Sequence, residues 1–154
     1  MAIIGKNLGV DPNKDEQYTP LWVFDRLNTH FDLDVASPGI GIDNVPASTR
    51  YTKDMDGLNL GWHGFVWMNP PYSKAKPWVE KFIAHNDGIA LLPYSKARWM
   101  IDMWNESSAI CPLYDIKFSQ REGKAKGIFM PTALFGMGSR AKEIIETASI
   151  NKVR

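Results

Sequence analysis

The run Asn69-Pro70-Pro71-Tyr72 combines residue types that could activate a planar, weakly nucleophilic amine. The side-chain oxygen of Asn69 and the backbone carbonyl of Pro70 are hydrogen-bond acceptors, and together they could take both hydrogens of such an amine. The two prolines restrict the backbone and thereby fix the direction of that carbonyl. Tyr72 offers an aromatic face for stacking, worth about 1–3 kcal/mol per nucleobase. These four residues are the candidate catalytic residues.

The chemistry that fits this run is attack by an amine with a delocalised lone pair, such as the exocyclic amine of adenine, on a methyl group bound to a positively charged sulfur. Two acceptors on the amine hydrogens favour a more tetrahedral nitrogen and free its lone pair. Stacking can offset the roughly few kcal/mol that turning a base out of a duplex costs. Two alternatives stay open. The planar amide of glutamine presents the same problem, and a proline-rich turn after a core strand requires no catalysis.

The elements around this run predict where it lies. Residues 64–68 form an apolar run that stops at Asn69, as a buried parallel strand does. In an open α/β sheet, ligands bind beyond the carboxyl ends of the strands. Asn69 is expected at such an end. A second predicted strand, residues 88–93, stops at the same edge just before Ser95.

Strand and helix patterns alternate along most of the chain, which predicts an α/β fold with a mostly parallel sheet. Helices are expected at residues 20–29, with Thr19 as N-cap, and at 78–85, 96–106 and 140–148. A first strand is expected at 31–36. Residues 39–60 look loop-rich, with little room for a full second strand and helix, so the fold is expected to be trimmed there. Strands at 113–118 and 128–136 are close enough to form a hairpin, which adds an antiparallel strand.

Length and composition are those of one globular domain. The 154 residues, 44% of them hydrophobic, predict a domain at residues 15–154 after a flexible arm at 1–14. No apolar run is long enough for a membrane span, and the first residues lack the pattern of a signal peptide, so a soluble intracellular protein is expected. Cys111 is the single cysteine, and the three histidines are scattered, so we expect neither a disulfide nor a metal site.

The formal net charge of +1 requires any DNA-binding surface to be local. Two basic groups stand out, one after the Asn-Pro-Pro-Tyr run and one nearer the C-terminus, which includes Lys117 and the predicted hairpin tip at residues 119–127. Residues after the predicted strand 88–93 could also touch phosphates, although Trp99 could equally pack in its helix. Ordinary solvated faces are the alternative for all of them. The candidate DNA-binding residues are Ser73, Lys74, Lys76, Ser95, Lys96, Arg98, Arg121, Lys124 and Lys126, with Lys81 and Lys117 in the same basic groups.

Several short motifs together resemble those of the phage-type DNA adenine methyltransferases, often labelled Dam. The similar stretches are residues 15–22, 33–38, 50–58, 67–73 and 91–93, with weaker similarity at 116–118 and 134–136. The resemblance implies a single Rossmann-like methyltransferase domain. It also implies S-adenosylmethionine as cofactor, the N6 amine of adenine in double-stranded DNA as acceptor, and no metal. A phage or prophage protein acting in the cytoplasm of a bacterial host is implied as well.

The same resemblance implies a set of cofactor-binding residues. Asp34, Ala36 and Ser37 would form the floor of the pocket at the end of the first strand. Thr19 and Pro20 would approach the methionine end of the cofactor. Asp54 or Asp56 would lie near the adenosine. The sequence departs from the wider methyltransferase pattern at residues 37–41, where Ser-Pro-Gly-Ile-Gly replaces the usual glycine-rich loop, and the acidic residue for the ribose has no obvious position.

Two further readings of the whole chain stay open. Release-factor glutamine methyltransferases resemble the same tetrapeptide, although they normally carry an additional helical domain for which we find no space. An inactive DNA-binding relative is the other reading, suggested by the atypical cofactor loop. No separate target-recognition domain fits, which suggests short or relaxed specificity or help from a second subunit in a homodimer.

Overall fold

The computed structural model describes residues 19–39, 44–113, 117–119, 125–127 and 131–154, with 117–119 and 125–127 described as backbone only. Its helices are α1 (Leu21–Leu27), α2 (Ala75–His85), α3 (Arg98–Glu106) and α4 (Ser139–Ala148). Its strands are β1 (Phe31–Ser37), β2 (Ala47–Thr52), β3 (Val66–Met68), β4 (Gly88–Pro93), β5 (Ala109–Leu113), β6 (Lys117–Ser119), β7 (Ala125–Gly127) and β8 (Thr132–Met137). Short 3-10 helices lie at Lys53–Met55, Gly57–Asn59 and Tyr72–Lys74. The arm predicted at residues 1–14 lies outside the described ranges.

Six of these strands form one mixed sheet in the order β2-β1-β3-β4-β8-β5. The pairings of β1 with β2, β1 with β3 and β3 with β4 are parallel. Strand β8 is antiparallel to both β4 and β5, between which it lies. The predicted α/β class, with its mostly parallel sheet and antiparallel C-terminal strand, is confirmed.

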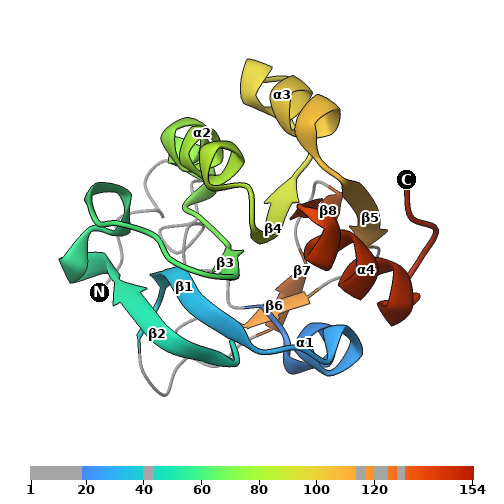
Figure 1. Cartoon of the computed structure of the whole chain (residues 1–154), viewed down its shortest axis with the longest axis horizontal. Coiled ribbons are helices and arrows are strands. Elements are labelled where there is room, and N and C mark those ends of the chain that lie inside the picture. The colour runs from blue at the N-terminus through green and yellow to red at the C-terminus, as the bar shows by residue number, and fades with distance from the viewer. Residues whose placement is uncertain (1–18, 40–43, 114–116, 120–124, 128–130) are drawn as a thin grey trace.

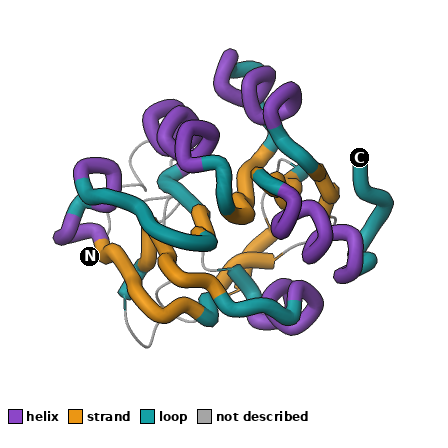
Figure 2. Tube along the Cα trace, in the orientation of Figure 1, coloured by secondary structure: helices purple, strands orange, loops and turns teal. Residues whose placement is uncertain are grey.

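Helices cover both faces of the sheet (Figures 1 and 2). On one face, α1 and α4 bury Phe24 and Ile145 against a core that includes Trp67 and Leu134. On the other face, α2 and α3 bury Phe82 and other apolar side chains against the sheet. A three-layer arrangement of this kind gives each amphipathic helix a sheet face to cover. None of the helices in the described ranges has the length and apolar character of a transmembrane span.

The passage after β1 was predicted as a loop with little room for a second strand, and this prediction is wrong in part. Strand β2 (Ala47–Thr52) pairs in parallel with β1 at the edge of the sheet, and no residue of it is fully buried. The described residues between the two strands, 38–39 and 44–46, contain no helix. The described residues between β1 and β2 therefore form no crossover helix, but the second strand is present.

The C-terminal hairpin is antiparallel as predicted, but its strands lie elsewhere. The first strand is β5 (Ala109–Leu113), whereas the sequence pattern placed it at residues 113–118. Its partner β8 (Thr132–Met137) starts later than the predicted 128–136. Strand β5 contains Pro112, which an edge strand tolerates because no strand of the sheet pairs with its outer side, where Ile110 exchanges backbone hydrogen bonds with Arg154 instead. Strands β6 and β7 form a separate two-stranded sheet, in which β6 overlaps the end of the predicted strand 113–118 and β7 lies at the end of the predicted hairpin tip.

Candidate active site

The carboxyl ends of β1, β2, β3 and β4 meet at one edge of the sheet because these strands are parallel. The chain passes from β1 outward to β2 and then returns to place β3 on the other side of β1. This change of direction between β1 and β3 is the position at which open α/β sheets bind ligands. Ser37 ends β1 there, and Asn69 directly follows β3.

Asn69 is half-buried, and a residue far away in sequence contacts its side chain. The amide nitrogen Nδ2 of Asn69 donates a hydrogen bond to Oγ1 of Thr19 over 3.2 Å. Thr19 is itself buried, and its backbone carbonyl accepts a hydrogen bond from Nδ2 of Asn44 at 2.9 Å. Thr19 was predicted as the N-cap of the first helix, and this is wrong. The cap position of α1 is Pro20, with no side-chain cap hydrogen bond.

The two prolines carry the chain from β3 into α2 without a long loop. Pro70 is buried and Pro71 is half-buried in an extended conformation, with φ −60° and ψ 119°. The carbonyl of Pro71 accepts a hydrogen bond from the backbone N–H of Lys74 at 3.1 Å, which closes the 3-10 turn Tyr72–Lys74. The half-buried Tyr72 begins that turn. The local backbone of the tetrapeptide is thus constrained at both ends.

The end of β1 holds two buried polar residues. Asp34 is 1% exposed, and its Oδ1 accepts a hydrogen bond from the backbone N–H of Ala36 at 3.2 Å. Ser37 is also buried, and its Oγ accepts a hydrogen bond from the backbone N–H of Gly39 at 3.1 Å. A buried carboxylate needs hydrogen bonds or a cationic partner, and the backbone N–H of Ala36 supplies one such hydrogen bond to Asp34.

The two acidic residues after β2 occupy different environments. Asp54 is exposed in the 3-10 turn Lys53–Met55 that directly follows the strand. Asp56 is exposed in a left-handed conformation, and its carboxylate accepts a hydrogen bond from the side chain of Asn59. Strand β2 was not predicted, so no position at the end of a second strand was predicted for the acidic residue that binds the ribose. The β-branched and aromatic residues in Ala47–Thr52 were the available signal.

The candidate DNA-binding residues that the structure describes follow β3 and β4 at the same edge. Ser73, Lys74 and Lys76 are exposed around the start of α2. At the start of α3, Lys96 and Arg98 are exposed. The half-buried Ser95 accepts a hydrogen bond at Oγ from the backbone N–H of Ala97 at 3.0 Å, and Arg98 pairs with Asp102 at 3.1 Å across the helix surface. Arg121 and Lys124 lie outside the described residues, and for Lys126 only the backbone is described.

Lys81 was grouped with the basic surface, and the structure contradicts that assignment. Its Nζ donates hydrogen bonds to the backbone carbonyls of Leu58, at 2.7 Å, and Leu60, and it lies 5.2 Å from the ring centre of Trp62. These hydrogen bonds link α2 to the segment before β3. Trp99 packs against the core on the α2 and α3 face, in agreement with the helix-packing alternative. The described residues contain no group of three or more side chains able to hold a metal ion.

Comparison with known proteins identifies the family. Residues 7–111, more than two thirds of the chain, match the family described as DNA N-6-adenine-methyltransferase (Dam). The chain belongs to this family. Its predicted resemblance to the Dam family is thereby confirmed, and the mixed α/β sheet is consistent with the Rossmann-like methyltransferase fold.

A curated relative supports the Dam assignment. The DNA N-6-adenine-methyltransferase of Haemophilus phage HP1 (strain HP1c1) is 34% identical to this chain over 89 residues. The aligned region covers 52% of this chain and 50% of the relative. The similarity therefore spans about half the length of that protein.

The Dam fold brings most of the predicted site residues to one edge. The end of β1, with Asp34, Ala36 and Ser37, lies beside the end of β3, which leads to Asn69. Asp54 and Asp56 follow the adjacent strand β2. Thr19 reaches this edge through its hydrogen bond to Asn69, and the sequence pattern gave no sign of that contact.

Proposed function

We propose that this chain transfers a methyl group from S-adenosylmethionine to the N6 amine of adenine in DNA. The observation that carries the proposal is the position of Asn69, a half-buried amide directly after β3 and beside the change of direction in the sheet. Membership of the Dam family supports both the reaction and the acceptor. A catalytic group in this position lies at the edge of the sheet where open α/β folds bind their ligands.

Asn69 and Pro70 would act on the acceptor amine. The Oδ1 atom of Asn69 accepts one N6 hydrogen and the Pro70 carbonyl accepts the other, which draws the nitrogen lone pair out of the ring system. The nitrogen would then take the methyl group that S-adenosylmethionine supplies, the electron pair of the broken carbon–sulfur bond would stay on sulfur, and one amine proton would leave to solvent. Because the prolines fix the backbone, these acceptors need little reorganisation during the reaction.

Tyr72 would hold the acceptor base by stacking. Tyr72 is half-buried at the start of the turn that leads into α2, three residues after Asn69. Stacking on an aromatic side chain contributes about 1–3 kcal/mol, similar in size to the cost of extruding a base. A base flipped onto Tyr72 would therefore be extruded at little net cost.

The residues at the ends of β1 and β2 fit S-adenosylmethionine. When bound, this cofactor supplies an electrophilic methyl group on a positively charged sulfur. The buried Asp34 and Ser37, together with Ala36, would form the floor beneath it. The exposed Asp54, which follows β2, would accept hydrogen bonds from the ribose hydroxyls of the cofactor, as an acidic residue does in dinucleotide-binding α/β folds. Thr19 and Pro20 would close the pocket from the side of α1.

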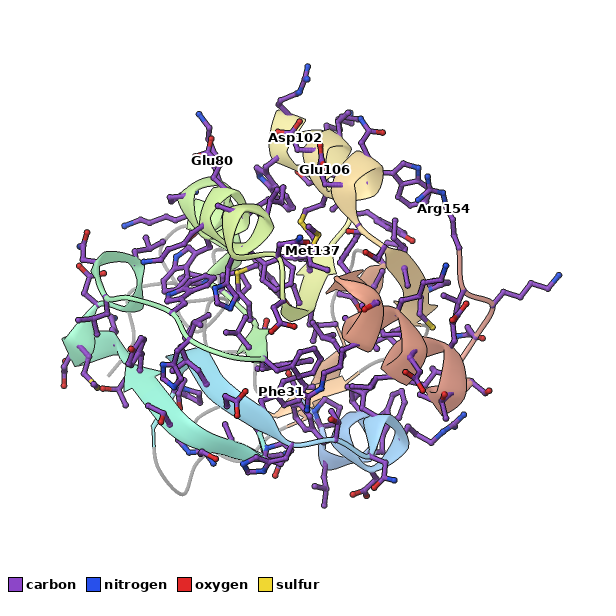
Figure 3. All side chains as sticks on the ribbon, in the orientation of Figure 1. Phe31, Glu80, Asp102, Glu106, Met137 and Arg154 are labelled. Carbon is purple, nitrogen blue, oxygen red and sulfur yellow. The ribbon has the colours of Figure 1, made fainter. Side chains whose placement is uncertain are left out.

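The DNA backbone would lie across the starts of α2 and α3. Lysines and an arginine project there, and helix N-termini add a favourable field for phosphate. The outward sides of the same two helices carry Glu80, Asp102 and Glu106 (Figure 3), which would repel phosphate further along. The proposed contacts are Ser73, Lys74, Lys76, Ser95, Lys96 and Arg98, with Arg121, Lys124 and Lys126 added from the sequence alone.

Partition of a labelled methyl group tests this function. Purified protein is incubated with methyl-labelled S-adenosylmethionine together with unmethylated duplex DNA and a bacterial lysate. We expect label in DNA, recovered as N6-methyldeoxyadenosine after digestion. Label in protein glutamine would favour the alternative acceptor, and cofactor binding without transfer to either would favour an inactive DNA-binding relative.

A further inference from the structure

Lys81 of α2 binds the backbone of the segment 57–61, which lies between β2 and β3. Its Nζ atom donates hydrogen bonds to the carbonyls of Leu58, at 2.7 Å, and Leu60. The same atom lies 5.2 Å from the ring centre of Trp62, which attracts a cation. Hydrogen bonds from a charged donor are roughly twice as strong as those between neutral groups. Lys81 is therefore a strong link between this segment and α2.

Other side chains hold the two ends of the same segment. The indole N–H of Trp62 donates to the carbonyl of Gly57 at 2.9 Å, and the hydroxyl of Tyr51 donates to the carbonyl of Gly61 at 2.7 Å. A backbone that belongs neither to an α-helix nor to a sheet needs partners of this kind for its polar groups. Lys81 binds the middle of the segment, between these two ends.

The middle of the segment is joined by hydrogen bonds to the turn that carries Asp54. Asn59 lies between the two residues whose carbonyls Lys81 binds. Its backbone N–H donates to the carbonyl of Asp56 at 3.0 Å, and its side chain donates to the Asp56 carboxylate. The backbone N–H of Asp56 in turn donates to the carbonyl of Lys53 at 3.3 Å, which closes the turn Lys53–Met55. A continuous set of contacts thus runs from Lys81 to the residues on either side of Asp54.

We propose that Lys81 is a positioning residue for the cofactor, acting through this turn on Asp54. Asp54 is exposed on a short 3-10 helix, so its carboxylate is fixed only as well as the turn is. Binding to an acceptor that is already in place avoids the entropic cost of ordering it. The role rests on the proposed function, because it assumes that Asp54 accepts hydrogen bonds from the ribose of S-adenosylmethionine.

His85 provides a matched control on the same helix. Its Nε2 atom donates to the carbonyl of Gly64 at 2.7 Å, and its ring centre lies 6.0 Å from that of Trp62. Like Lys81, it links α2 to the chain between β2 and β3, but at the end next to β3. Lys81→Met keeps an unbranched apolar side chain and removes the donors, and His85→Leu removes the corresponding donor. Both variants should be less stable than the wild type.

Cofactor affinity separates positioning from general support of the fold. We expect Lys81→Met to weaken binding of S-adenosylhomocysteine about threefold to tenfold in calorimetry, the effect of having to order one or two side chains on binding. KM for S-adenosylmethionine should rise by the same factor, with a much smaller change in kcat. His85→Leu should leave the affinity within about twofold of the wild type. Unchanged affinity in Lys81→Met, or equal losses in both variants, would overturn the proposal.

The sharper test repeats the substitution in an Asp54→Asn background. If Lys81 acts through the Asp54 carboxylate, then Lys81→Met should weaken S-adenosylhomocysteine binding by less than about twofold once that carboxylate is gone. The same loss as in the Asp54 background would mean that Lys81 acts on the cofactor site by another route, and the positioning role would be wrong. Where Lys81→Met does not fold, Lys81→Gln, which keeps a neutral donor, takes its place in each comparison with the same expected directions.

A measurement without cofactor tests the link from Lys81 to the turn alone. In hydrogen–deuterium exchange, the backbone amides of Asp56 and Asn59 should exchange faster in Lys81→Met than in the wild type and His85→Leu, because their acceptors are less well fixed. Equal exchange in all three proteins would overturn the proposal. Failure of the wild type to bind S-adenosylhomocysteine would remove the proposed function together with the cofactor role of Lys81. Binding without methyl transfer to DNA would remove the proposed function only.

Discussion

Gly57 packs directly against the backbone carbonyl of Val35, the third-last residue of β1. A Cβ atom built on Gly57 would lie 2.2 Å from that carbonyl oxygen and 3.4 Å from the ring of Trp78. No side chain fits in that space, so only glycine allows the turn after β2 to lie this close to β1. The contact fixes the segment that carries Asp54 and Asp56 at the proposed cofactor edge.

Gly57→Ala should therefore lower the free energy of unfolding by about 1–3 kcal/mol, the usual cost of overpacking, and weaken cofactor binding. Gly61→Ala is the matched control, because a Cβ there meets nothing within 4 Å. Urea unfolding followed by tryptophan fluorescence measures both variants. Equal stability of the two would show that the turn can shift away from β1 at no cost.

The sequence was most informative where strands are fully buried. Residues 88–93 were predicted as a strand and form β4 with these bounds, because a continuous apolar run bounded by glycine and proline has few alternatives. Strand β2 gave no such signal, since it is a half-exposed edge strand stabilised mainly by pairing with β1. Strand β5 was predicted at residues 113–118, but it spans Ala109–Leu113 and includes Pro112, which the edge position tolerates.

The residues of the candidate site were likewise predictable only where the local sequence is informative. The tetrapeptide at Asn69 could be read from local residue types and from the strand before it. The Thr19 contact could not, because no local pattern links residues that the fold brings together across 50 positions. Lys81 was misread for a related reason. Its charge is visible in the sequence, but the carbonyls that bind it belong to Leu58 and Leu60, on a different segment.

Lys76 and Lys81 should respond oppositely to neutralisation. Lys76→Gln should weaken DNA binding and reduce the slope of log affinity against log salt by about one, as loss of one phosphate contact does. Lys81→Gln should leave that slope unchanged and lower the free energy of unfolding by about 1–3 kcal/mol, because two backbone carbonyls lose their charged donor. Fluorescence anisotropy with a labelled duplex at several salt concentrations measures the slopes. The same reduced slope in both variants would contradict the structural role of Lys81.

Asp54 and Asp56 offer a matched pair for the cofactor. Asp54→Asn should reduce affinity for S-adenosylhomocysteine about tenfold, since a charge-assisted hydrogen bond contributes roughly 1.5–3 kcal/mol. Asp56→Asn should leave that affinity within about twofold, because this carboxylate is engaged with Asn59. Isothermal titration calorimetry measures both. A larger loss for Asp56→Asn would reverse the assignment of the ribose contact.

Cys111 should make stability depend on alkaline pH. Burial raises the pKa of its thiol above the ordinary value of 9.0, against smaller lowering effects of Asn151 and Arg26. The unfolded chain then loses the thiol proton before the folded protein does, so the contribution to stability is complete below pH 9.0 and is lost as the pH rises toward the folded pKa. Cys111→Ala should lack this part of the alkaline decline in urea unfolding. An identical decline in both proteins would argue against a raised pKa.

Analysis of the DNA product from Asn69→Ala tests the central claim most directly. Wild-type protein and the variant are incubated with duplex DNA and S-adenosylmethionine, the DNA is digested to nucleosides, and N6-methyldeoxyadenosine is quantified by mass spectrometry. We expect the product with the wild type and at least about a 10²-fold loss with Asn69→Ala, with affinity for S-adenosylhomocysteine within about twofold of the wild type. Full product formation by Asn69→Ala would contradict the role assigned to this amide.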